Sequence, residues 1–155
     1  MQFLINKTGH VLPHQISTPN FLFFILLLFM YSLPTSFRLK WSERIPLTTE
    51  GVSRLHTVSG VYRLVYQNGN DFTVYYVGQA VDLAARMTDH LADNEQNNCC
   101  KRITGRYPHF YRVAGVETSN LDSCERALWE NYGGRQGLLC NERIPIVTPA
   151  NINMD

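Results

Sequence analysis

The stretch that decides the fold is residues 73–91, TVYYVGQAVDLAARMTDHL. Residues 73–77 are all β-branched or aromatic, which is typical of a β-strand, and Gly78 follows them directly. From residue 80 the apolar positions recur with a helical period, and Arg86 and His90 stand four residues apart, on one face of a helix. A buried strand needs no glycine at its exit, and a surface helix needs no Arg and His in register. The pattern therefore predicts a strand-to-helix unit with a functional site at its junction.

A β-hairpin is predicted just before this junction. Residues 58–67, VSGVYRLVYQ, form its first strand, and the turn chemistry of NGND at 68–71 returns the chain into the second strand. In an antiparallel hairpin the start of one strand lies beside the end of the next, so Tyr62 and Tyr76 are expected to be neighbours. Gly78 is expected to let the backbone turn sharply into a helix over 80–92.

The rest of the chain completes a small domain. The further predicted elements are a loop at 94–100, a strand at 109–117, and a helix that Asn120 or Asp122 caps and Gly133-Gly134 ends. The fold class is therefore α/β, an α+β sandwich in which helices flank a small three-stranded antiparallel sheet. We expect this domain to span residues 56–147, with a tail at 148–155.

Bulk composition sets limits on the function. The chain has 155 residues, a size typical of one domain. Its 14 Lys and Arg against 13 Asp and Glu give a net charge of +1. This balance provides no general basic field for strong non-specific binding to nucleic acid, although a single face can still be basic.

The four cysteines are interpreted as reduced, partly buried thiols. Cys99 and Cys100 are adjacent and so do not form a CxxC zinc half-site. A disulfide framework is poorly motivated in a chain that has enough residues for a core.

Residues 1–40 are predicted to be an irregular N-terminal extension with an apolar run at 21–31, FLFFILLLFMY. Its 11 residues fall short of the ~20 that a helix needs to cross a bilayer. Several interpretations stay open: a non-functional or weakly anchoring extension, with Met30 as the true initiator, a membrane anchor, a helix packed on the domain, or a cleaved signal. Basic residues after the run favour a cytoplasmic domain. We therefore expect a cytoplasmic protein, with weak membrane association through 21–31 as an alternative.

The motifs in the globular part resemble those of the GIY-YIG endonuclease family. The resemblance spans residues 58–145 and rests on six features in order, namely Gly60-Val61-Tyr62, Tyr76-Val77-Gly78, Arg86, His90, Glu125 and Asn141. Arg86 stands eight residues after Gly78, and His90 four residues after Arg86, as in the family pattern. The thirteen residues between Tyr62 and Tyr76 are slightly more than usual, which a longer hairpin absorbs.

The resemblance implies a metal-dependent endonuclease that hydrolyses DNA phosphodiester bonds. Glu125 would hold a single Mg²⁺ or Mn²⁺. Tyr62 would be the general base, with its pKa lowered by Arg86 or by metal-bound water. Arg86 would clamp the scissile phosphate, while Tyr76 and His90 would orient water or phosphate and help to shuttle a proton.

Further residues are expected to bind substrate or to shape the site. These are Gly78, Lys101, Arg102, Arg112 and Asn141, of which the last is expected to fix geometry rather than touch DNA. The run KRITGRYPHFYR at 101–112 interleaves cations and aromatics and could follow a nucleic-acid strand. Packing at a strand edge explains it as well.

The expected partner is DNA, branched or damaged DNA included, with a protein partner or a dimer as alternatives for target choice. A non-catalytic nucleic-acid-binding module of the same fold is the alternative function. Taken singly, each residue has a plainer explanation: a cross-strand tyrosine pair, or charges on a solvated helix face.

Overall fold

The computed structural model describes residues 36–91 and 95–154. The apolar run at 21–31 therefore lies outside the described residues. Within the described ranges, no helix is both long enough and apolar enough to span a membrane.

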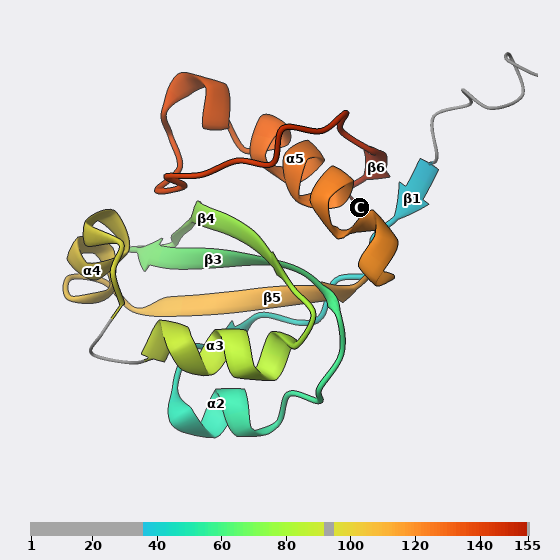
Figure 1. Ribbon diagram of the computed structural model, residues 1–155. Helices are drawn as coiled ribbons and strands as arrows, with labels where there is room; N and C mark the ends of the chain where they lie inside the picture. The colour runs from blue at the N-terminus through green and yellow to red at the C-terminus, as the bar shows by residue number, and fades with distance from the viewer. Residues whose placement is uncertain (1–35, 92–94, 155) are drawn as a thin grey trace, which may run out of the picture. The chain divides into compact units, whose positions relative to one another are not determined.

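Strands and helices are interspersed along the described chain (Figure 1). The strands are β1 (Ser36–Arg38), β2 (Ile45–Pro46), β3 (Gly60–Asn68), β4 (Asp71–Ala80), β5 (His109–Gly115) and β6 (Asn151–Asn153). The α-helices are α2 (Thr49–Ser53), α3 (Leu83–Leu91), α4 (Asn98–Thr104) and α5 (Leu121–Asn131). Short 3₁₀ turns are η1 (Thr118–Asn120) and η2 (Gly134–Gln136).

The central sheet is antiparallel, with strand order β2-β5-β3-β4, and a parallel pair of β1 and β6 lies apart from it. The predicted α/β class is confirmed, but the predicted three strands are four. The additional strand β2 pairs only Ile45 and Pro46 with β5. Two residues, one of them proline, carry no alternating pattern, so this strand left no signal in the sequence.

The predicted hairpin is confirmed, with an irregularity in its second strand. Asn68 pairs with Asp71, and Gly69 turns the chain with a φ of +60°. Further along, Val65 pairs with Val74 but Leu64 pairs with Tyr76. The residue between them, Tyr75, is therefore a β-bulge. The bulge, as well as the turn, absorbs the extra length between Tyr62 and Tyr76.

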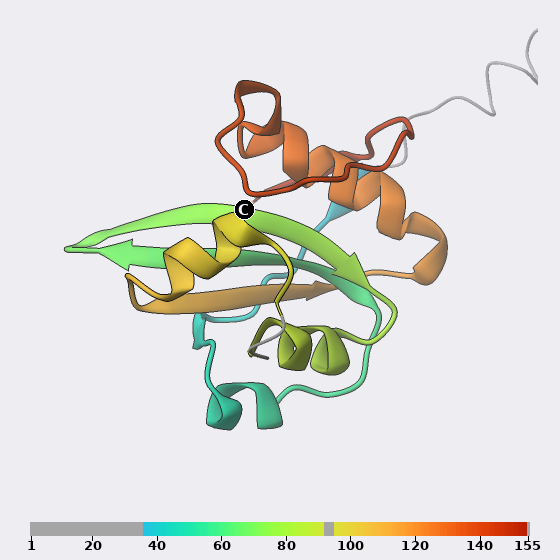
Figure 2. The ribbon, with the colours of Figure 1, turned by 60° about the vertical axis from the view of Figure 1, so that its left-hand side comes forward.

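Helices cover both faces of the sheet (Figures 1 and 2). On one face, Tyr62 of β3 packs in a core with Leu83 and Met87 of α3. On the other face, Val61 packs with residues of α5, among them Leu128. Leu47 and Val52, which precede the predicted domain start at residue 56, also belong to the Tyr62 core.

The helix ends follow local chemistry, with two corrections. Asn120 is the N-cap residue of α5, but its side chain makes no capping hydrogen bond. Gly133, at φ +80°, ends α5 as predicted. The predicted loop at 94–100 is partly wrong, because α4 begins at Asn98. The Asn97 side chain accepts a hydrogen bond from the Cys100 N–H and so caps this helix.

Candidate active site at the edge of β4

The Tyr62 phenol is the centre of a buried hydrogen-bonded cluster. Its side chain is 1% exposed. The Tyr62 Oη accepts a hydrogen bond from Arg86 Nε at 3.0 Å and lies 3.0 Å from His90 Nε2. The Tyr76 ring stacks on the Tyr62 ring with 6.1 Å between centroids. The structure thus brings together four of the predicted site residues, contributed by β3, β4 and α3.

Gly78 serves this cluster in a way that differs from the prediction. β4 continues through Gly78 to Ala80, so the chain makes no sharp turn at the glycine. A Cβ at this position would lie 2.4 Å from both Cζ and Oη of Tyr62, which is directly across the strand pair. Gly78 is therefore required because the Tyr62 ring covers it.

Glu95 completes the cluster on the far side of His90. Glu95 Oε2 lies 2.7 Å from His90 Nδ1, and Glu95 Oε1 accepts from the Asn97 N–H at 2.9 Å. Burial, and then the Arg86 charge, lower the pKa of His90. With a neutral ring that donates from Nδ1 to Glu95, Nε2 is left to accept from the Tyr62 hydroxyl. Sequence reasoning missed Glu95, since a carboxylate five residues after a helical histidine is a weak signal.

The protonation of Tyr62 runs against the prediction. Burial raises the pKa of Tyr62 well above its usual value, and the nearby Tyr76 raises it further. Arg86 lowers the pKa of Tyr62, as predicted, but does not outweigh the burial. The phenol is therefore neutral at rest and can act as a base only if its own proton moves to a neighbour such as His90.

Glu125 approaches the same site from α5. Gln79 of β4 donates hydrogen bonds to Glu125 Oε2 at 3.1 Å and to Asp122 Oδ1. Burial raises the pKa of Glu125 to about 7, although the Gln79 hydrogen bond opposes this. Glu125 shares a cavity of about 510 Å³ with Tyr62, Tyr76 and Arg86, and the polar lining of this cavity also includes Gln79, Asp122 and Arg143.

The donor set at this cavity fits a hard divalent cation. Among residues 36–91 and 95–154, no three His, Cys, Asp or Glu side chains gather as a metal-binding group. The half-buried Glu125 offers oxygen ligands, as does the neighbouring Asp122, and Mg²⁺ typically binds one or two carboxylates while it keeps several waters. The raised pKa of Glu125 reflects burial without full compensation by positive charge, which a cation would supply.

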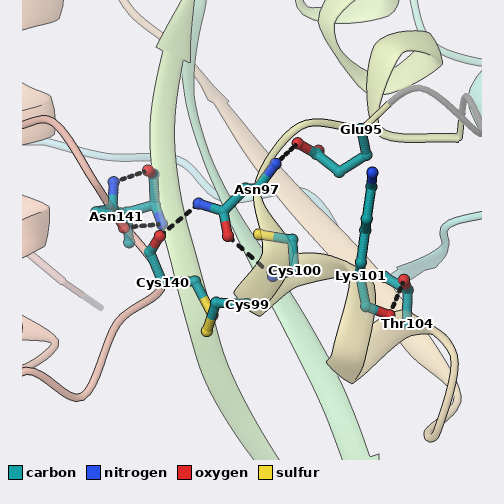
Figure 3. Close-up of a disulfide and its surroundings, with 9 residues drawn as sticks. Glu95, Asn97, Cys99, Cys100, Lys101, Thr104, Cys140 and Asn141 are labelled. Carbon is teal, nitrogen blue, oxygen red and sulfur yellow. Dashed lines mark hydrogen bonds between the residues drawn. A yellow bond between two sulfur atoms is a disulfide. The ribbon is translucent and has the colours of Figure 1, made fainter.

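Asn141 lies beside the site and pairs with the backbone. Its Nδ2 donates to the Val77 carbonyl at 2.7 Å, and its Oδ1 accepts from the Val77 N–H at 3.2 Å. The neighbouring Cys140 N–H donates to the Tyr75 carbonyl at 2.7 Å. Asn141 therefore fixes the outer edge of β4 rather than facing a substrate (Figure 3).

The three remaining predicted cations do not join the Tyr62 cluster. Lys101 lines a separate hollow behind His90 and Glu95. Arg102 is exposed in the last turn of α4. Arg112 pairs across the sheet with Arg63, the residue after Tyr62, and so lies on the opposite face.

A disulfide ties α4 to the segment that carries Asn141 (Figure 3). Cys99 and Cys140 are bonded, with their Cα atoms 5.4 Å apart. The Asn97 side chain donates to the Cys140 carbonyl at 2.6 Å and holds the same two segments together. The interpretation of all four cysteines as reduced thiols is therefore wrong for this pair, and it holds for the buried Cys100 and Cys124.

The chain is similar to solved structures of the GIY-YIG N-terminal endonuclease domain of UvrC from Thermotoga maritima. Three point mutants of that domain, each bound to its catalytic divalent cation, match at 19–20% identity and a TM-score of 0.42. The matches cover 54% of this chain and 86% of that chain. No protein-family model and no curated protein sequence matches this chain.

Proposed function

We propose that the protein is a metal-dependent endonuclease that hydrolyses phosphodiester bonds of DNA. One observation carries the proposal: a continuous chain of contacts from Glu95 through His90 and Tyr62 to Arg86, at a cavity that also holds Glu125. Such a chain can move a proton away from an attacking water and present positive charge to a phosphate, which are the two demands of hydrolysis.

Tyr62 and His90 together provide the base. As the oxygen of a water attacks phosphorus, Tyr62 Oη takes the water's proton, and the Tyr62 proton passes to His90 Nε2, 3.0 Å away. The imidazolium that results faces the Glu95 carboxylate, which stabilises its charge. The high pKa of Tyr62 is then no obstacle, because no free phenolate is needed at rest.

Arg86, and the cation that Glu125 would hold, stabilise the negative charge of the phosphate. Arg86 Nε donates to Tyr62 Oη, and Arg86 Nη1 lies 3.6 Å from the carboxylate of the exposed Asp89. Other N–H groups of the guanidinium remain to bind the scissile phosphate in the cavity. Glu125, beside Asp122, would hold Mg²⁺ or Mn²⁺. When bound, such a cation acts as a Lewis acid that stabilises charge on the phosphate and on the leaving oxygen.

The test is cleavage of supercoiled plasmid, branched DNA and damaged duplex by the full chain, with Mg²⁺, Mn²⁺ or a chelator. We expect nicking that needs the metal and falls by roughly 10³-fold or more in Glu125→Ala and in Arg86→Ala. The matched controls are Glu130→Ala, on the same helix but paired with Arg126 and Arg135, and the exposed Arg54→Ala.

Two outcomes would overturn the proposal. Cleavage that survives Glu125→Ala would remove the metal-binding role and this assignment of the site. Binding of DNA without cleavage of any substrate, equal in wild type and variants, would instead favour the non-catalytic nucleic-acid-binding module.

A further inference from the structure

Two arginines lie directly opposite each other on the face of the sheet away from Tyr62. Successive residues of a strand point to opposite faces, so Arg63 lies on the face opposite Tyr62. Arg63 of β3 pairs in register with Arg112 of β5. Like charges at directly opposite positions destabilise a sheet, so this pair has a cost that the fold alone does not explain.

Aromatic rings, rather than carboxylates, lie beside the Arg63 guanidinium. The Arg63 guanidinium carbon lies 4.4 Å from the centroid of the Trp41 ring and 5.4 Å from that of Tyr132. Arg63 Nε is buried without a hydrogen-bond partner. Burial, and then the charges of Arg112 and Arg44, lower the pKa of Arg63 to about 10.

Arg44 extends the cluster toward the hairpin end of the sheet. Its guanidinium carbon lies 3.5 Å from the centroid of the Phe72 ring, and Phe72 packs edge-on against Phe110 at 5.8 Å. Phe72 is 43% exposed although it is a large apolar side chain. The face therefore presents cations beside two aromatic rings, of which Phe72 is exposed and Phe110 is half-buried.

No carboxylate neutralises this cluster in the described part of the chain. The ion pairs within residues 36–91 and 95–154 involve other basic groups, namely Arg54, Arg86, His90, Arg126 and Arg135. Arg112 does use Nε to donate to the Ser42 carbonyl at 2.7 Å, which leaves its other N–H groups available. A local excess of positive charge in a chain of net charge +1 is complementary to a polyanion.

We propose that this arginine face, formed by Arg44, Arg63, Arg112, Phe72 and Phe110, binds single-stranded nucleic acid. The guanidinium groups would contact phosphates, and the rings would stack with bases, which is the combination that sequence-tolerant single-strand binding uses. The surface goes beyond the proposed cleavage site, since it lies on the other face of the sheet and requires neither metal nor Glu125.

Binding can be measured without cleavage, which separates this proposal from the proposed function. The full chain is titrated in chelator against a 5′-labelled 20-nucleotide single strand and the matching duplex, with fluorescence anisotropy as readout, from 50 to 300 mM salt. The key variant combines Arg63→Met with Arg112→Gln. The matched control is Arg54→Gln, an exposed arginine already paired with Glu50.

We expect the double variant to bind the single strand at least about 10-fold more weakly at 50 mM salt. The slope of log K against log salt should flatten by about 1.4, at about 0.7 for each lost phosphate contact. Phe72→Ala should weaken binding by about 5-fold or more through lost stacking. The charge-conserving combination of Arg63→Lys with Arg112→Lys should keep most of the slope. If the first double variant bound weakly only because its structure was disturbed, the loss of binding would not depend on whether the charges were kept.

Affinity and slope unchanged in the double variant would overturn the proposal, as would an equal loss in Arg54→Gln. A loss confined to duplex DNA would overturn the assignment to single strands. The titration in chelator measures binding alone, so failure of the cleavage assay leaves this result intact.

Discussion

Tyr62 and Arg63 are neighbours in the chain, yet their surroundings on the two faces of the sheet are opposite in character. The Tyr62 hydroxyl has two hydrogen-bond partners, and the next group along, His90, has its own carboxylate in Glu95. Arg63 faces Arg112 and has no carboxylate among the described residues. The difference teaches that the groups around the Tyr62 hydroxyl are paired internally, as in a preorganised site, whereas Arg63 Nε has no hydrogen-bond partner among the described residues.

Removing the phenol is the strongest way to break this contrast. Tyr62→Phe deletes the oxygen between His90 and Arg86, and we expect cleavage to fall by about 10²–10⁴-fold. The free energy of unfolding should also fall by about 1–3 kcal/mol, because two buried polar atoms lose their partner. Plasmid nicking rates and urea unfolding measure the two effects. Tyr66→Phe, in the same strand and on the same face, is the matched control, and full activity of Tyr62→Phe would exclude Tyr62 from the chemistry.

A substitution that crowds the Tyr62 ring tests the packing on this face of the sheet without removing a polar group. Gly78→Ala places a Cβ 2.4 Å from Tyr62 Oη, and we expect a loss of about 1–3 kcal/mol in urea unfolding. Gly115→Ala is the control, since no heavy atom lies within 4 Å of its added Cβ. In a Tyr62→Leu background the cost of Gly78→Ala should shrink, because the clashing atoms are gone. An equal cost in both backgrounds would contradict the steric explanation.

The pH dependence of stability tests the paired state of the Tyr62 face, and its expected effect is smaller. Burial and Arg86 lower the pKa of His90 in the folded state. Below about pH 6.5 this histidine therefore binds a proton in the unfolded chain, whereas in the folded chain it stays neutral to a lower pH. The free energy of unfolding consequently falls as the pH drops from about 6.5 toward the folded pKa. Glu125, with its pKa raised to about 7, acts with the opposite sign, since its ionisation weakens the fold as pH rises.

The comparison is therefore made between wild type and His90→Gln, so that the Glu125 contribution cancels. Urea unfolding at pH 7 and pH 5 should show a larger loss on acidification in wild type than in the variant. The exposed His56→Gln should keep the wild-type loss. Identical losses in wild type and His90→Gln would show that His90 is not held neutral.

The smallest expected effect is on the arginine face and has the opposite sign. Arg63→Met keeps the packed stem and removes one member of a like-charged pair, so the free energy of unfolding should rise by about 0.2–1 kcal/mol at low salt. The gain should shrink as salt screens the repulsion. Arg63→Lys, which keeps the charge, should show no gain, and a destabilised Arg63→Met would mean that the contacts of Arg63 with the Trp41 and Tyr132 rings outweigh its repulsion by Arg112.

Local signals in the sequence predicted the parts of the fold that depend on neighbours in the chain. Asn68-Gly69 predicted the hairpin, and the spacing of Arg86 and His90 predicted that both side chains turn to one face of α3. Given the hairpin, the meeting of Tyr62 and Tyr76 followed, and the stacked rings confirm it.

What could not be predicted depends on registers and contacts between distant segments. The bulge at Tyr75 leaves no pattern of its own, and the face on which Arg112 lies depends on the register of β5 against β3. The Cys99–Cys140 bond joins residues 41 positions apart, whose proximity follows from the docking of α4 beside β4. The contact of Glu95 with His90 likewise follows from tertiary structure and not from helical spacing, since Glu95 lies outside α3.

Asn141 has a consequence beyond the site, for the behaviour of the protein at high concentration. β4 is the outermost strand of the sheet, and an open strand edge invites pairing with another chain. The Asn141 side chain occupies both the N–H and the carbonyl of Val77, and the Cys140 N–H occupies the carbonyl of Tyr75. The segment that steadies the site therefore also closes the sheet against edge-to-edge aggregation, and a protein that loses it would be expected to self-associate.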